Sequence, residues 1–99
     1  MSRITSILEK VREERERQEK LWGQQNHNPA IWLMILGEEV GEANQAYCEA
    51  YFAKGKGIIH NELRHLRTEL IQVAAVAVAI VESLDRNEIA EIEREIDYK

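Results

Sequence analysis

Residues that interrupt helices are scarce in this chain of 99 residues, which contains one proline and five glycines. A small all-β domain needs frequent turns, so this scarcity excludes that class and favours long helices. The lone Cys48 excludes an intrachain disulfide framework and is typical of a reducing, cytoplasmic location. The longest apolar run, residues 73–81, falls well short of the about 20 residues that span a bilayer. We therefore expect no membrane partner. The chain also turns charged by Glu9, so we expect no signal peptide.

Positive charge is also in short supply. The 13 basic residues are outnumbered by 18 acidic ones, which gives a formal net charge of −5. We therefore do not expect the chain to bind nucleic acid through electrostatic attraction to its phosphates. Apolar residues make up 44% of the chain, enough for a folded domain. The length predicts a single domain over residues 1–99 with one small core, which would be marginally stable as a monomer.

Hydrophobic periodicity predicts an all-α fold. Apolar residues from Ile4 to Val11 indicate a first helix over 2–22, whose charged run is interpreted as a solvated face. Asn28 before Pro29 is a strong start signal for a second helix over 29–52. A third helix is predicted over 61–84. The spacing of Asp85 and Glu88 suggests a capping box that begins a short fourth helix ending near Asp97.

The third helix is the reason to expect more than one chain. Residues 73–81 are β-branched or alanine on every side of the helix, and a bundle of three helices cannot cover all of them. The predicted architecture is a small helical bundle of three long helices plus the short C-terminal one, completed in a homodimer or homotetramer. Gly37 and Gly41, four residues apart, would allow another backbone to approach closely.

Acidic residues follow directly on an apolar segment of the second helix. Glu38, Glu39 and Glu42 share a 100° arc, so their like charges repel and their pKa values should rise unless a cation binds. On the third helix, Glu69 and Gln72 belong to a polar stripe that begins at Glu62 and includes His65. If the two helices are antiparallel, these groups could enclose a Mg²⁺ site. Simple exposure to water is the alternative for the three glutamates, and a structural polar layer is the alternative for the two helices together.

These residues also carry a resemblance to a known family. The segment 22–27 with Pro29, the segment 37–42 and the segment 69–72 together resemble the MazG-like, all-α nucleoside triphosphate pyrophosphohydrolases. The similarity covers roughly residues 15–85. It includes the EExxE helix formed by Glu38, Glu39 and Glu42, and a later ExxD helix that here reads Glu69 to Gln72.

The resemblance implies a Mg²⁺-dependent enzyme, with Mn²⁺ as a possible substitute, that converts an NTP or dNTP to the monophosphate and pyrophosphate. It also implies roles for particular residues. The implied metal ligands are Glu38, Glu39, Glu42, Glu69 and Gln72, and the implied substrate contacts are Trp22, His27, Trp32 and Lys54. Glu38 or Glu39 would also activate the attacking water. Three of these substrate residues have an alternative interpretation. Trp32 could belong to the core, and His27 could make a hydrogen bond at the start of the second helix. Lys54 could simply be solvated.

Two other functions fit parts of the pattern. Gln72 supplies an amide where the family has an acid, so the chain could instead be a non-catalytic helical oligomer that binds nucleotide or a protein partner. Glu62 and His65 have the Glu-x-x-His spacing of di-iron bundles, although that architecture needs two such pairs. Iron content would separate the di-iron site from a Mg²⁺ site.

Overall fold

The computed structural model describes residues 2–52 and 59–87, with the side chains of Ala50 and residues 59–62 left aside. These residues form three helices and no strand: α1 (Arg3–Trp22), α2 (Pro29–Phe52) and α3 (Ile59–Arg86). The all-α prediction is therefore confirmed for the described part of the chain. The expected fourth helix and Lys54 lie outside it.

Capping residues set the helix starts. The Ser2 hydroxyl accepts a hydrogen bond from the backbone N–H of Thr5 at 3.2 Å, which begins α1 at Arg3. The Asn28 side chain accepts from the backbone N–H of Ile31 at 3.0 Å, so α2 begins at Pro29 as predicted. At the end of α1, Gly23 adopts φ 72° and its N–H bonds the carbonyl of Glu19, a conformation in which glycine is favoured.

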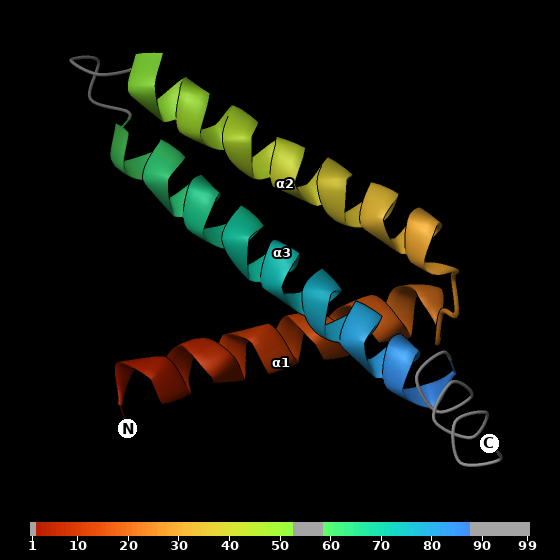
Figure 1. Ribbon diagram of the computed structural model, residues 1–99. Helices are drawn as coiled ribbons and strands as arrows, with labels where there is room; N and C mark the ends of the chain where they lie inside the picture. Colours follow the sequence, from red (N-terminus) through yellow and green to blue (C-terminus); the bar gives the residue numbers. More distant parts are fainter. Residues whose placement is uncertain (1, 53–58, 88–99) are drawn as a thin grey trace, which may run out of the picture.

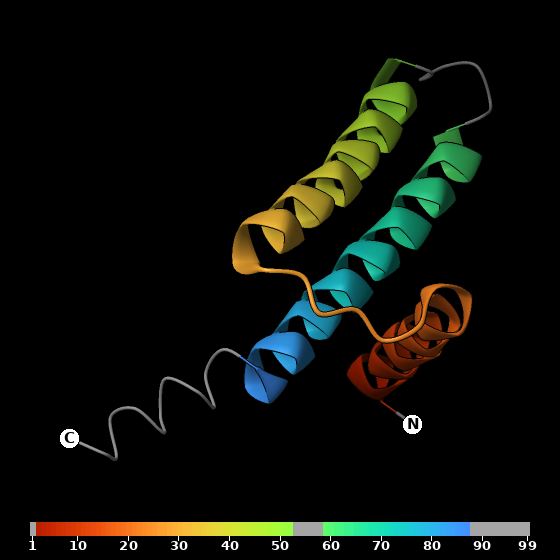
Figure 2. The same cartoon turned by 90° about the vertical axis from the view of Figure 1, so that its right-hand side faces the viewer.

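Helices α2 and α3 form an antiparallel hairpin, and α1 crosses α3 near its C-terminal half (Figure 1). In the view of Figure 2, α1 and α2 lie on different sides of α3. Within the described residues, α1 packs against α3 and not against α2. None of these helices is both long enough and apolar enough to cross a membrane.

The core is thin because small side chains dominate it. Ala46 and Ala75 are almost fully buried, and Trp32 is the largest side chain with less than a tenth of its surface exposed among the described residues. Small residues at the contact let helices approach closely. Many large apolar side chains meanwhile remain exposed, among them Leu33, Leu70 and Val81. One chain therefore leaves much of its apolar surface uncovered.

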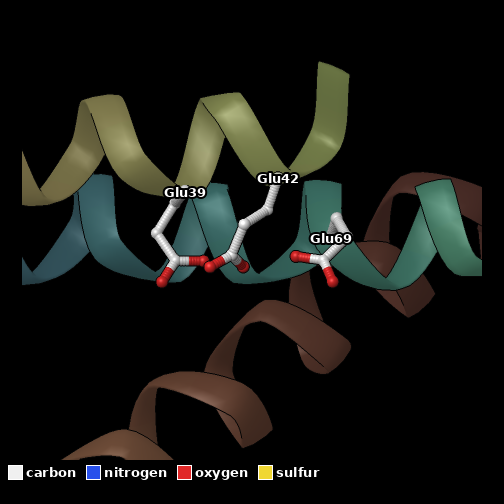
Figure 3. Close-up of side chains that lie close together, drawn as sticks. All are labelled: Glu39, Glu42 and Glu69. Atoms are coloured by element: carbon white, nitrogen blue, oxygen red, sulfur yellow. The ribbon is translucent and has the colours of Figure 1, made fainter. Parts of the chain in front are cut away.

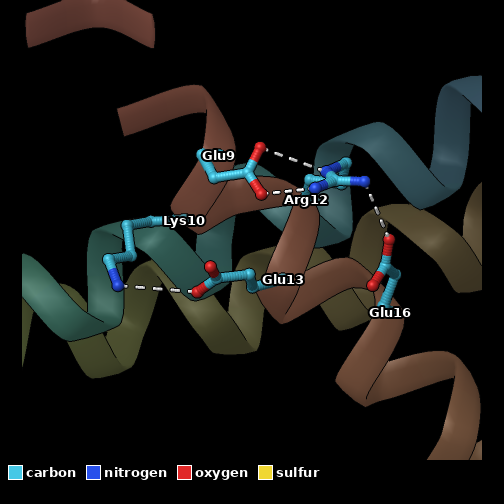
Figure 4. Close-up of polar contacts among 5 residues, drawn as sticks. All are labelled: Glu9, Lys10, Arg12, Glu13 and Glu16. Atoms are coloured by element: carbon cyan, nitrogen blue, oxygen red, sulfur yellow. Dashed lines mark hydrogen bonds and ion pairs between the residues drawn. The ribbon is translucent and has the colours of Figure 1, made fainter. Parts of the chain in front are cut away.

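The outer face of α1 carries several ion pairs between residues three or four apart (Figure 4). The Arg12 guanidinium bonds Glu9 and lies 3.6 Å from Glu16, and the Lys10 ammonium lies 3.5 Å from Glu13. These side chains are largely exposed, so each pair adds little stability. The solvated interpretation of the charged run is confirmed for this face of α1.

Two arginines, Arg15 and Arg86, make polar contacts between separate elements of the fold. Arg15 of α1 donates to Glu82 of α3 at 2.8 Å, and its side chain is 13% exposed. Arg86 donates to the carbonyl of Gln25 at 3.2 Å and to the Asn26 side chain at 3.0 Å. The loop between α1 and α2 is thereby tied to the end of α3.

Candidate metal centre

Three carboxylates meet where α2 lies alongside α3. Glu39 and Glu42 lie one turn apart on α2, and Glu69 lies on α3. One oxygen from each carboxylate lies within 4.8 Å of the other two. Figure 3 shows the side chains reaching from the two helices toward one another. A spacing of three residues puts Glu39 and Glu42 on one helix face, and the antiparallel course of α3 brings Glu69 to them.

The three carboxylates repel one another. Burial raises the pKa of Glu39, and the nearby charges of Glu42 and Glu69 raise it further. The pKa of Glu42 is raised mainly by a hydrogen bond with Glu69, for which Glu42 holds the proton, and then by desolvation and by the charge of Glu69. The His65 imidazole Nε2 lies 3.0 Å from Glu69 Oε1. Bringing these acids together is therefore unfavourable unless they share protons or bind a cation.

Two carboxylate oxygens at this position have unused hydrogen-bonding capacity. Oε2 of Glu39 and Oε2 of Glu69 are buried and have no hydrogen-bond partner among the described residues. Buried polar atoms normally have a partner, and a hard divalent cation prefers carboxylate oxygens as ligands. The donor set therefore fits Mg²⁺ or Mn²⁺.

Helix α1 adds a fourth carboxylate that the sequence interpretation missed. Glu14 is near enough to contribute to the raised pKa of Glu39. Gln18, which is 7% exposed, donates to Glu14 at 3.0 Å, and Arg17 pairs with Glu14 at 2.7 Å. These hydrogen bonds lower the pKa of Glu14 despite its partial burial. Val11, Glu14 and Gln18 recur at i, i+3 and i+7, the signal that could have placed them on the inward face.

A pocket of about 220 Å³ adjoins Glu39, one of the three carboxylates. Its walls come from all three helices and from Gly23 and Gln25 of the loop, and they include Glu39 and both tryptophans, Trp22 and Trp32. Trp32 is 3% exposed, which agrees with the alternative of a core position, and its indole Nε1 is buried without a hydrogen-bond partner among the described residues. His27 packs edge-on against Trp32 with ring centroids 4.9 Å apart.

The remaining predicted site residues lie elsewhere. Glu38 is exposed and stands outside the group of three, although its charge contributes to the raised pKa of Glu39. Gln72 is half-buried and lines a hollow between α1 and α3 together with Glu14 and Arg17. Metal ligation by Glu38 and Gln72, and substrate contact by Lys54, stay predictions.

A scan against protein-family models, a search of curated proteins and a search of solved structures find no match to this chain.

Proposed function

We propose that the chain is a Mg²⁺-dependent nucleoside triphosphate pyrophosphohydrolase of the MazG-like, all-α kind, acting in the cytoplasm as a homodimer or homotetramer. One observation supports the proposal most directly: the carboxylates of Glu39, Glu42 and Glu69 lie close together. Two acidic segments 27 residues apart in sequence, Glu42 and Glu69, come from different helices and bring their oxygens within 4.8 Å. This is the pairing that the resemblance implies.

In this proposal Glu39, Glu42 and Glu69 hold the cation, with Glu38 and Gln72 as further candidate ligands. When bound, Mg²⁺ supplies positive charge for the phosphate oxygens of the substrate. The adjoining pocket would take the base or ribose against Trp22 and Trp32, with His27 supporting Trp32. Lys54 is the proposed contact to the phosphates.

The reaction adds water to the α-phosphorus and breaks its bond to the oxygen bridging to the β-phosphorus, which releases pyrophosphate and leaves the monophosphate. A carboxylate must orient the water and accept its proton. Glu39 suits this role because it lines the pocket beside the place proposed for the substrate. Glu38 is the alternative base.

The test measures pyrophosphate and monophosphate released from the four NTPs and the four dNTPs, with Mg²⁺, with Mn²⁺ and with EDTA. We expect metal-dependent release that is lost in Glu42→Gln and in Glu69→Gln. Glu49→Gln is the matched control, because Glu49 lies exposed on the same helix outside the group of three. Release in EDTA, or full release by both site variants, would contradict the proposal.

A folded wild-type chain that binds Mn²⁺ and nucleotide without releasing pyrophosphate would instead support the non-catalytic oligomer. In that event Gln72→Asp would be the first variant to test, because it replaces the amide by the acid that the family has at this position. A chain purified with bound iron would point to the di-iron site. Of the two residues that suggest it, Glu62 has no described side chain, and His65 contacts Glu69.

A further inference from the structure

Positive charge gathers in the hollow between α1 and α3. This hollow has a volume of about 280 Å³, and its basic side chains are Lys10 and Arg17 of α1 and Arg67 of α3. Gln72 adds an amide, which can donate a hydrogen bond as well. The same hollow has two carboxylates, so its formal charge is positive in a chain whose net charge is −5. A hollow of this composition favours an anionic ligand.

The three cations differ in how firmly they are paired. The Arg17 guanidinium donates to both oxygens of Glu14, at 2.8 and 2.7 Å, so the charge of Arg17 is already neutralised. The Lys10 ammonium only approaches Glu13 at 3.5 Å, and both side chains are more than half exposed, which makes this pair weak (Figure 4). Arg67 forms no ion pair with a residue that the structure describes. Lys10 and Arg67, which come from two different helices, can therefore bind an anion in the hollow.

The carboxylate centre joins this hollow to the pocket. On α3, Thr68 lines the hollow and directly precedes Glu69. On α1, Glu14 lines the hollow, and its charge is near enough to contribute to the raised pKa of Glu39. Glu39 also lines the pocket, which lies further along α3 at Val76, eight residues or about 12 Å beyond Thr68. A ligand that reaches from the pocket to the hollow would therefore pass the centre.

We propose that the hollow binds the two terminal phosphates of a nucleoside triphosphate, with Lys10 and Arg67 as the contacts. The inference rests on the proposed function. With the base in the pocket and the α-phosphorus at the centre, the β- and γ-phosphates extend into the hollow. The Arg67 guanidinium presents N–H donors in one plane that suit two phosphate oxygens, and the Lys10 ammonium adds a compact charge. Neither residue is among the substrate contacts that the resemblance implies.

This arrangement distinguishes a triphosphate from a monophosphate. A monophosphate ends at the centre and reaches neither cation, so the hollow adds nothing to its binding. Pyrophosphate, the other product, keeps both of its phosphates in the hollow after the bond is broken. Arg17 has a supporting role, because its pairing with Glu14 limits the repulsion between that carboxylate and the phosphates. Lys10 and Arg67 therefore select substrates by the length of the phosphate chain.

The first assay is titration calorimetry of the full chain with inorganic pyrophosphate in Mg²⁺. Arg67→Gln and Lys10→Gln should each weaken binding about tenfold or more, because each removes a charged hydrogen bond to phosphate. Arg64→Gln is the matched control, since it removes the same charge from an exposed position one turn away on α3, outside the hollow. It should bind pyrophosphate like wild type. Equal weakening by Arg67→Gln and Arg64→Gln, or a wild-type chain that does not bind pyrophosphate, would overturn the proposal.

A second assay tests the length of the phosphate chain. The probes are the α,β-methylene analogues of the four NTPs, which cannot be cleaved between the α- and β-phosphates, and the four monophosphates. Arg67→Gln should weaken binding of an analogue about tenfold and leave binding of its monophosphate unchanged, whereas equal losses for both would overturn the proposal. Unchanged pyrophosphate binding by Arg67→Gln in a chain that hydrolyses nucleotides would overturn this inference alone. Pyrophosphate binding that depends on Arg67, in a chain that hydrolyses nothing, would support it and overturn only the proposed function.

Discussion

Replacing Gly37 by alanine should change the stability of a free chain and that of a paired chain in opposite directions. Glycine in a helix interior costs about 1 kcal/mol relative to alanine, and the added Cβ has open space in its own chain. A free chain should therefore gain about 1 kcal/mol, which raises the melting temperature by about 4–8 °C for a domain of this size. In a paired chain the same methyl group meets the partner helix, where overpacking costs about 1–3 kcal/mol.

The assay is thermal unfolding followed by circular dichroism, with wild type and Gly37→Ala compared at a dilute and at a concentrated setting. Each sample acts as its own control, because only the extent of pairing changes. We expect the variant to melt higher than wild type when dilute, and to lose that gain when concentrated. A gain of 4–8 °C at both concentrations would show that no helix packs closely over Gly37 and would refute the reasoning.

Three further results follow from the centre and its surroundings. Trp32→Ala, at a site 3% exposed, should cost about 3–5 kcal/mol and leave little helical signal at 37 °C; a fully folded variant would contradict the core position. Because the pKa of Glu39 is raised in the folded chain, its ionisation lowers the stability of the fold as the pH rises above the ordinary range of a glutamate. In EDTA, Glu39→Gln should therefore melt like wild type at pH 4 and above it at pH 8; a pH-independent difference would count against this. Glu14→Gln should weaken Mn²⁺ binding about 10- to 100-fold by calorimetry, whereas Glu13→Gln, on the exposed face, should not.

The helices were predictable because their signals are local. Asn28 and Pro29 fix the start of α2 through hydrogen bonds and backbone angles that depend on neighbouring residues alone. The start and end of α3 differ from the prediction by two residues each, at Ile59 and Arg86, because the turns that flank an apolar stretch lack such a marker.

The centre was predictable in part. Helical spacing identified Glu39, Glu42 and Glu69, since residues three or four apart share a face and the hairpin is antiparallel. Spacing could not separate Glu38 from Glu39, because that depends on how α2 is rotated against α3. Glu14 was missed since its neighbours in sequence are charged and its burial arises from the crossing of α1 over α3.

The crossing of α1 over α3 separates the described residues into two parts, α1 and the hairpin of α2 and α3. All three carboxylates of the candidate centre belong to the hairpin, while α1 contributes Arg15, Gln18 and Trp22 to the pocket wall and, within the described residues, packs against α3 and not against α2. Native-state hydrogen exchange should thus find α1 opening at lower free energy than the hairpin. Swinging α1 outward would widen the access route to the pocket for a bulky solute without moving the three carboxylates of the candidate centre.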